Sequence, residues 1–273
     1  MTGLVSALHR PRLGALALTI AVLLSACADK KDEYVERPVE ELYNDAMDLV
    51  DKSEYYKAAK AFEEVERQHP YSVWATKAQM MAAYSLYERN KYDDAVIHLD
   101  RFIQLHPGNK DTAYAYYLKG LCYYEQITDV ARDQKMTEMA MKSLQEVVDR
   151  FPSSGYAKDA KLKVDLARDH LAGKEMTIGR YYQKRSQWLA ALNRYKLVVE
   201  NYQTTTHVAE ALHRMVEIYL TLGLDEEAKR TAAVLGHNFP GSDWYEDTFS
   251  LVKSGKPATE AAKGEKSGWL GLW

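Results

Sequence analysis

The most constraining feature of this chain is a segment that occurs four times and ends each time in proline. Pro70, Pro107, Pro152 and Pro240 close the similar stretches AAKAFEEVERQHP, AVIHLDRFIQLHP, AMKSLQEVVDRFP and AKRTAAVLGHNFP. Apolar residues in each stretch recur three and four positions apart, which places them on one face of a helix. Proline ends such a helix because it has no N–H to donate. A unit that recurs in this way buries its apolar face against neighbouring copies, so the chain is predicted to be a stacked helical array.

Each of these segments offers a small, a large and a further small or apolar residue at fixed spacing. A fifth copy has Gln203 at the proline position. The five triplets are Ala58, Phe62, Val65; Ala95, Leu99, Phe102; Ala140, Leu144, Val147; Ala191, Tyr195, Val198; and Ala228, Ala232, Leu235. They resemble the second helices of tetratricopeptide repeats. The resemblance implies an all-α fold, a right-handed α-solenoid of about five helix-turn-helix repeats.

The first helices of the repeats are predicted from matching positions further upstream. They are Leu42, Ala46, Leu49; Gln79, Ala83, Leu86; Gly120, Tyr123; Gly179, Tyr182, Trp188; and Leu212, Val216, Tyr219. Repeat 3 fits only if about eight residues are inserted near Gln126–Met139. An extra helical stretch, 155–171, precedes repeat 4 and is expected to lengthen its first helix. Residues 241–254 are predicted to form a capping helix with Ser242 at its N-cap.

The N-terminal segment is typical of an exported protein. Residues 1–26 combine Arg10 and Arg12 with a twelve-residue apolar run, Leu13–Leu24, which is too short to span a bilayer as a helix. The sequence Leu-Ser-Ala-Cys at 24–27 resembles the lipobox of bacterial lipoproteins, which implies that Cys27 carries the covalent lipid and begins a tether over 27–38. Ala28 follows that cysteine, and the resemblance then implies an outer-membrane protein facing the periplasm. An ordinary secretory signal is the alternative.

The twenty tyrosines of the chain concentrate on one predicted surface. In tetratricopeptide arrays the first helices of the repeats line the concave face. Repeats 1–3 contribute twelve positions to this face, and six of them are tyrosine here. We therefore predict a peptide-binding groove in the N-terminal repeats, 39–152, formed by Tyr43, Met47, Met80, Tyr84, Tyr87, Tyr114, Tyr117 and Tyr124. The same stripe is polar and charged in the C-terminal repeats, 153–254, which suits a folded partner. Packing of these tyrosines against a neighbouring helix or an N-terminal segment is the alternative.

Charge and motif content argue against two other classes of protein. With 36 Lys and Arg against 39 Asp and Glu and no basic run, the chain lacks the footprint of a nucleic-acid binder. Hydrolase, phosphate-binding and zinc-protease motifs are absent, and the eight histidines are scattered singly. We expect a non-enzyme without metal or cofactor, apart from the lipid on Cys27. Residues 255–273 are expected to be a flexible tail, and their aromatic end, Trp269–Trp273, is either a docking element or an unremarkable terminus.

Three stretches carry a more specific resemblance: FIQLHP at 102–107, HPYS at 69–72, and the segment from Tyr181-Tyr182 through Trp188 to Asn193-Arg194. They are similar to the BamD family, also called ComL, of lipoproteins in the outer-membrane β-barrel assembly machinery. The resemblance implies that the N-terminal repeats engage the aromatic-ended C-terminal signal of unfolded barrel proteins. It also implies that the C-terminal repeats bind the periplasmic domains of the barrel subunit and the accessory lipoproteins, through Arg194 with Tyr181, Tyr182 and Arg185. A periplasmic repeat adaptor for peptidoglycan enzymes or proteases is the alternative function.

Overall fold

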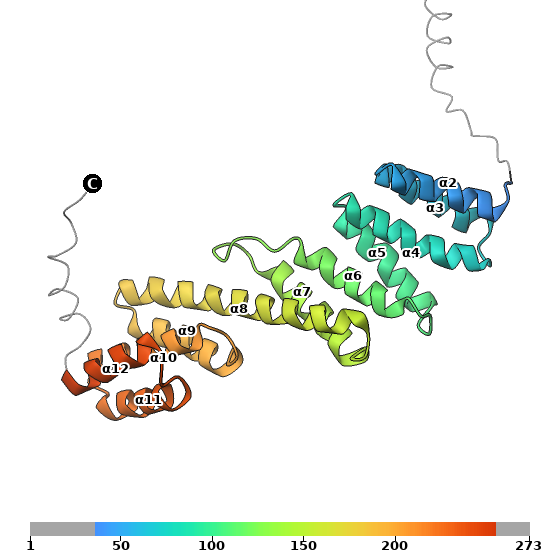
Figure 1. Ribbon diagram of the computed structural model, residues 1–273. Helices are drawn as coiled ribbons and strands as arrows, with labels where there is room; N and C mark the ends of the chain where they lie inside the picture. The colour runs from blue at the N-terminus through green and yellow to red at the C-terminus, as the bar shows by residue number, and fades with distance from the viewer. Residues whose placement is uncertain (1–35, 255–273) are drawn as a thin grey trace, which may run out of the picture. The chain divides into compact units, whose positions relative to one another are not determined.

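The computed structural model describes residues 36–254, and within that range it contains eleven α-helices and no strand (Figure 1). These helices belong to the unit Val39–Trp273. They are α2 (Val39–Asp51), α3 (Tyr55–Gln68), α4 (Val73–Glu88), α5 (Tyr92–Leu105), α6 (Thr112–Tyr124), α7 (Lys135–Arg150), α8 (Gly155–Lys184), α9 (Trp188–Asn201), α10 (Val208–Thr221), α11 (Asp225–Asn238) and α12 (Asp243–Ser254). Five consecutive helix pairs followed by a capping helix confirm the predicted all-α tetratricopeptide architecture.

The second helix of every repeat ends in the same way. The residues after α3, α5, α7, α9 and α11 all have φ between −125° and −133°, and each donates its N–H to the carbonyl four residues earlier. In four repeats a proline follows, and the residue before proline is disfavoured in the helical region. Repeat 4 has Gln203 instead, and α9 still stops at Asn201. Proline therefore reinforces the helix end but is not required for it, since α9 of repeat 4 ends in the same way without one.

A left-handed residue makes the turn between the two helices of a repeat. Ser53, Asn90, Ser186 and Gly223 have φ between 58° and 73° and occupy equivalent places in repeats 1, 2, 4 and 5. Such a conformation reverses the chain in few residues. Repeat 3 replaces this turn with the predicted insertion, a loop over residues 125–134, which we call the insertion loop.

The predicted core positions are buried. In repeats 1–4 all members of the second-helix triplets are at most 1% exposed, whereas Ala232 in repeat 5 is half-buried. Leu49 in α2 is also half-buried. After α11 only the short α12 follows, so the face of α11 that carries Ala232 has less to pack against than the equivalent faces of the earlier repeats.

Glycines allow close contact between the two helices of repeats 3 and 4. A β-carbon at Gly120 would lie 2.5 Å from Cδ2 of Leu144, and one at Gly179 would overlap the ring of Tyr195. A larger residue at either position would push the paired helix away. The smallest residue thus faces one of the largest residues of the partner helix in both repeats.

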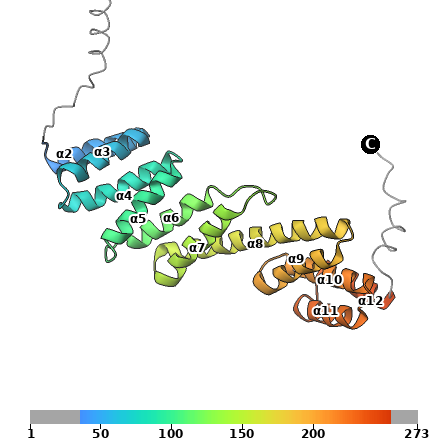
Figure 2. The same ribbon diagram turned by 180° about the vertical axis from the view of Figure 1, so that it is seen from behind.

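Helix α8 belongs to two cores at once. Its thirty residues form one continuous helix, so the extra stretch at 155–171 lengthens the first helix of repeat 4 as predicted. Ala160 and Val164 pack with α7, while Ala172 and Met176 pack with α9 and α10. Figures 1 and 2 show α7 beside the first half of α8 and α9 beside the second half.

The last helix closes the array. The hydroxyl oxygen of Ser242 accepts a hydrogen bond from the N–H of Tyr245 at 3.2 Å, which confirms the predicted N-cap. The Tyr245 ring occupies the space where Gly236 of α11 lacks a side chain. None of the helices within 36–254 has the length and apolarity needed to cross a bilayer.

Candidate functional site

Five tyrosines from three successive first helices form a continuous surface, which we call the tyrosine cluster. Tyr84 and Tyr87 come from α4, Tyr114 and Tyr117 from α6, and Tyr156 from α8. The ring centroid of Tyr156 lies 5.3 Å from that of Tyr114 and 5.2 Å from that of Tyr117, the latter pair stacked at 24°. The structure thus brings together four of the predicted groove tyrosines and adds a fifth.

Four of these residues are half-buried, and the fifth, Tyr156, is 37% exposed. Tyr84, Tyr87, Tyr114 and Tyr117 pack against the cores of repeats 2 and 3, as the packing alternative requires, and each stays partly accessible to solvent. Half-exposed tyrosines present a rigid apolar face and a polar hydroxyl at small entropic cost. The cluster therefore has the composition of a peptide-binding surface, and packing and binding are compatible roles for it.

The hydroxyl groups of four cluster residues, Tyr84, Tyr87, Tyr114 and Tyr117, have raised pKa values and stay protonated far above neutral pH. Burial is the main cause, and it raises the pKa of Tyr87 to about 12. The pKa of Tyr114 is raised by burial and then by the neighbouring Tyr84 and Tyr156. For Tyr117, burial is reinforced by a hydrogen bond that its hydroxyl donates to Asp159. A ligand would meet neutral phenols that can donate hydrogen bonds.

The other predicted groove residues lie apart from this cluster. Tyr43 packs with its ring centroid 4.8 Å from Trp74, and Met47 belongs to the same core of repeat 1. Met80 is only 7% exposed and lies in the core of repeat 2, so it offers little surface to a ligand. Tyr124 lies at the end of α6 with the Lys163 ammonium 5.7 Å from its ring centroid.

Tyr156 was missed because the concave stripe of repeat 4 was taken from the second half of α8. The first turns of α8 lay in the extra stretch and were assigned no surface role. Asp159 follows Tyr156 by three residues, and Lys163 follows Asp159 by four. This spacing indicates that all three share one helix face. That face is the one α8 turns toward α6, where Asp159 accepts hydrogen bonds from Tyr117 and, at 2.6 Å, from Lys163.

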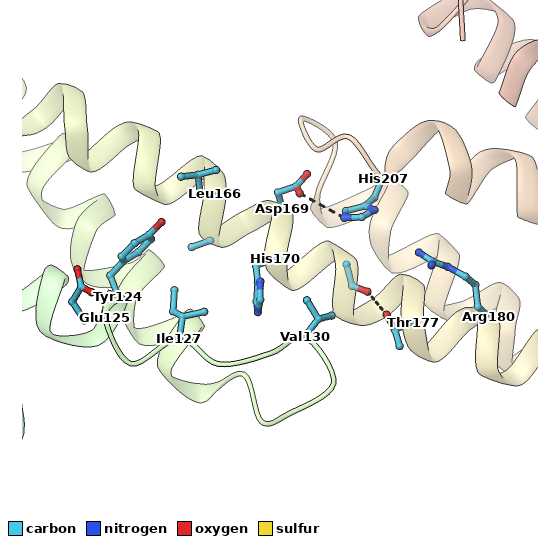
Figure 3. Close-up of a pocket in the computed structure, with 12 residues that line it drawn as sticks. Tyr124, Glu125, Ile127, Val130, Leu166, Asp169, His170, Thr177, Arg180 and His207 are labelled. Carbon is cyan, nitrogen blue, oxygen red and sulfur yellow. Dashed lines mark hydrogen bonds and ion pairs between the residues drawn. The ribbon is translucent and has the colours of Figure 1, made fainter. Parts of the chain in front are cut away.

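A hollow of about 650 Å³ lies along α8 between Leu166 and Arg180 (Figure 3). We call it the α8 trough. Its lining comes from the end of α6, the insertion loop, α8 and the connection between α9 and α10: Tyr124, Glu125, Ile127, Val130, Leu166, Ala167, Asp169, His170, Gly173, Thr177, Arg180 and His207. In Figure 3 the insertion loop runs along one side of α8, and His207 approaches from the other.

The insertion loop is fixed to α8 and to itself by hydrogen bonds. The buried Gln134 side chain donates to the carbonyl oxygens of Asp129 and Arg132 at 3.2 and 3.1 Å and accepts from the Thr137 hydroxyl at 2.8 Å. Lys174 of α8 donates to the carbonyl of Ala131 at 2.8 Å. The side wall of the trough is therefore an ordered part of the fold.

A charged network replaces the tyrosines between α8, α10 and α12. Glu217 accepts from Arg214 at 2.9 Å and from the Gln183 amide at 2.9 Å. Burial alone would raise the pKa of Glu217, but the hydrogen bond with His213 and the charge of Arg214 outweigh it and lower that pKa to about 2. The change from aromatic to charged character predicted for the concave stripe is present in the structure.

The predicted partner-binding residues lie on α8 and α9 in two places. Arg194 of α9 forms an ion pair with Glu175 of α8 at 3.0 Å. Tyr181 is 51% exposed, and the Arg185 guanidinium lies 4.3 Å from its ring centroid. Tyr182 is half-buried and packs on the core of the C-terminal repeats. Tyr181 and Arg185 therefore form an exposed aromatic-cationic pair, of the kind common in protein interfaces.

Two observations limit other chemistry in the part of the chain that the structure describes. Among residues 36–254 there is no group of three or more His, Cys, Asp or Glu arranged to hold a metal ion. Cys122 is buried in α6, and burial raises the pKa of its thiol to about 12. The predicted lipid site at Cys27 and the tail at 255–273 lie outside the described residues.

Comparison with known proteins decides the family. The model of the YfiO family, described as outer membrane lipoprotein, matches residues 35–235. The chain belongs to this family. The outer membrane protein assembly factor BamD of Caulobacter vibrioides is 50% identical over 260 residues, which cover 93% of this chain and 85% of the relative. BamD of Rickettsia prowazekii is 47% identical, covering 89% and 97% of the two chains. BamD of Neisseria meningitidis is 35% identical, covering 83% and 91%.

Proposed function

We propose that this protein is a non-catalytic, lipid-anchored component of outer-membrane protein assembly that faces the periplasm. Its relatives are named assembly factors, and its fold is a helical repeat of the kind used to bind other proteins. In this role the N-terminal repeats recognise unfolded barrel proteins by an aromatic-ended C-terminal segment. The C-terminal repeats bind the periplasmic domains of the barrel subunit and the accessory lipoproteins.

The tyrosine cluster is the observation that carries the proposal. An extended peptide places alternate side chains on one side, about 6.6 Å apart, so aromatic residues two positions apart meet successive rings of a flat aromatic surface. Tyr84, Tyr87, Tyr114, Tyr117 and Tyr156 supply such a surface across three helices. Aromatic contacts of this type contribute about 0.5–1.5 kcal/mol each beyond area burial.

The direct test replaces the two cluster tyrosines of α4. The double substitution Tyr84→Ala and Tyr87→Ala should weaken binding of a fluorescent peptide ending in phenylalanine by at least about tenfold, since two ring contacts are lost. Tyr71→Ala is the matched control, because Tyr71 is fully exposed on the turn before α4. Circular dichroism establishes that each variant keeps its helices. Equal affinity of the double variant and the control for the peptide would overturn the assignment.

The division between the two halves of the array predicts separable defects. Arg194→Glu reverses the charge beside Glu175 and should release the barrel subunit on co-purification from detergent-solubilised membranes, while peptide binding stays unchanged. Arg230→Glu, on the exposed side of α11, is the control for a charge reversal alone. Recovery of peptidoglycan enzymes or proteases in place of a barrel subunit would favour the adaptor function.

A further inference from the structure

We propose that the α8 trough is the subsite for the carboxyl-terminal end of the bound peptide, with its terminal carboxylate beside Arg180 and His207. This inference rests on the proposed function, in which the tyrosine cluster binds the aromatic part of the same peptide. It adds a chemical requirement that the cluster cannot impose, namely a free terminal carboxylate.

The trough is linked to the tyrosine cluster by a chain of contacts. Tyr117 donates to Asp159, which also accepts from Lys163, and the Lys163 ammonium lies 5.7 Å from the ring centroid of Tyr124. Tyr124 and Glu125 line its first part, and Glu125 lies near enough to Tyr87 to raise the pKa of that phenol, after the larger effect of burial. From Tyr156 to Arg180 the axis of α8 advances by about 36 Å, since a helix rises about 1.5 Å per residue. An extended peptide covers this span with about eleven residues at roughly 3.3 Å each. One short segment can therefore reach from the cluster to Arg180.

The first half of the trough suits an apolar side chain. Leu166 is 51% exposed on α8, and Ile127 and Val130 of the insertion loop line the same hollow. Its volume falls within the roughly 300–1,000 Å³ of ordinary ligand sites. Gly173 keeps the floor open, because a β-carbon there would lie 3.2 Å from Nε2 of His207 and 3.8 Å from Cγ1 of Val130. A terminal aromatic ring fits this apolar part.

The far half of the trough suits an anion. Of the two carboxylates that line the trough, Asp169 lies in this half and is hydrogen-bonded: its Oδ1 accepts from the N–H and hydroxyl of Thr206 at 3.0 and 2.9 Å, and Oδ2 lies 3.6 Å from His207. Arg180 remains 47% exposed, and its partner Glu210, at 3.3 Å, is shared with Arg214. A guanidinium has five donors in a planar fork that matches a carboxylate. Arg180 can thus bind a terminal carboxylate and keep its ion pair with Glu210.

The two ends of the trough offer a carboxylate different neighbours, which fixes the direction of the ligand. Glu125 is exposed at the tyrosine end, whereas the other end has the half-exposed guanidinium of Arg180 beside its ion-pair partner Glu210. A terminal carboxylate is repelled by Glu125 and finds a charged hydrogen-bond donor at Arg180. The peptide is therefore oriented with its chain end toward repeat 5 and its preceding residues over the tyrosine cluster.

The test compares two forms of one fluorescent peptide of about fifteen residues, long enough to reach from the tyrosine cluster to Arg180. It has alternating aromatic residues and a terminal phenylalanine, and is used as the free acid and as the C-terminal amide. We expect the wild-type protein to bind the free acid about tenfold more tightly than the amide, as loss of a charge-assisted hydrogen bond predicts. Arg180→Gln should remove this preference and leave the affinity for the amide unchanged. Arg168→Gln is the matched control, because Arg168 is also on α8 but pairs with Asp165 away from the trough.

The possible outcomes separate the two proposals. If the wild-type protein binds both peptides equally, and Tyr84→Ala with Tyr87→Ala weakens both, the carboxylate subsite is wrong and the proposed function stands. If neither peptide binds, the proposed function fails as well. If Arg180→Gln keeps the preference for the free acid, the carboxylate lies elsewhere. A Gly173→Val variant adds a second check. Filling the floor of the trough should lower the affinity for the free-acid peptide in a protein whose Arg180 is intact.

Discussion

Gly179 of α8 lies so close to Tyr195 of α9 that a β-carbon at position 179 would overlap the tyrosine ring. The same ring donates its hydroxyl hydrogen to Oε1 of Gln183 at 2.7 Å, and Gln183 in turn donates to Glu217. One close approach between two helices therefore supports both the core of repeat 4 and the charged network behind it.

Gly179→Ala should consequently destabilise the protein in spite of the better helix propensity of alanine. Overpacking against Tyr195 is expected to lower the free energy of unfolding by about 2 kcal/mol. The midpoint temperature of thermal unfolding should then fall by roughly 4–8 °C for a chain of this size. Gly155→Ala is the control, because nothing lies within 4 Å of a β-carbon at that position. An unchanged midpoint for Gly179→Ala would show that α9 moves aside at little cost.

The insertion loop should depend on the side chain of Gln134. Gln134→Ala removes the hydrogen bonds to Asp129, Val130 and Arg132 that hold the loop together. We expect faster amide hydrogen exchange over residues 126–134 with little change in the global unfolding midpoint, since Gln134 is the one buried residue between 125 and 134 and the helix cores do not depend on the loop. Gln145→Ala removes an exposed bond to Asp149 on α7 and should leave the loop protected. Unaltered exchange in the loop of the Gln134 variant would contradict this account.

Glu217 should make stability depend on acid pH. Its pKa is about 2 in the folded protein, below the ordinary glutamate value of 4.5, so the folded state favours the ionised form. The stabilisation is present above about pH 4.5 and is lost as the pH falls toward 2, and it amounts to about 3 kcal/mol at the upper end. Urea unfolding at a series of pH values should show a shallower decline for Glu217→Gln than for the wild type. Parallel declines would assign the acid sensitivity to other carboxylates.

Tyr117 and Tyr156 should differ in what their loss affects. Tyr117→Phe removes the hydrogen bond to Asp159 but keeps the ring stacked on Tyr156, so peptide affinity should change less than threefold while stability falls by about 1 kcal/mol. Tyr156→Ala removes the ring that joins α8 to the tyrosine cluster and should weaken peptide binding about five- to tenfold. Fluorescence anisotropy with the same peptide measures both. A larger effect of Tyr117→Phe would place the hydroxyl, and not the aromatic surface, at the centre of recognition.

The fold could be predicted in detail because the spacing of apolar residues within each repeat identifies the residues that are buried. Spacing alone placed Phe62, Leu99 and Leu144 inside, and all three are fully buried. The helix-to-helix turns were not predicted, because Ser53, Asn90 and Ser186 adopt a left-handed conformation that glycine usually marks in sequence. Among these four turn residues, Gly223 is the one glycine.

The candidate site was predicted less completely, for a physical reason. A helical stripe identifies which residues face the same way, but it does not say which residue of the next repeat covers them. Met80 therefore counted as surface although α5 and α6 bury it, and Tyr156 was missed although it contacts two predicted tyrosines. The α8 trough depends on the insertion loop and on the connection between α9 and α10, which no periodicity describes.

The unbroken length of α8 has a mechanical consequence. Thirty residues make a strut of about 45 Å, and a helix resists both stretching and twisting. The tyrosine cluster meets this strut at Tyr156 near its start, and the surface that includes Tyr181 lies near its end. Their separation is set by covalent geometry and not by the balance of loop contacts. Lengthening the strut by one turn would displace one surface from the other by about 5.4 Å, whereas the same addition to the insertion loop would leave that separation unchanged.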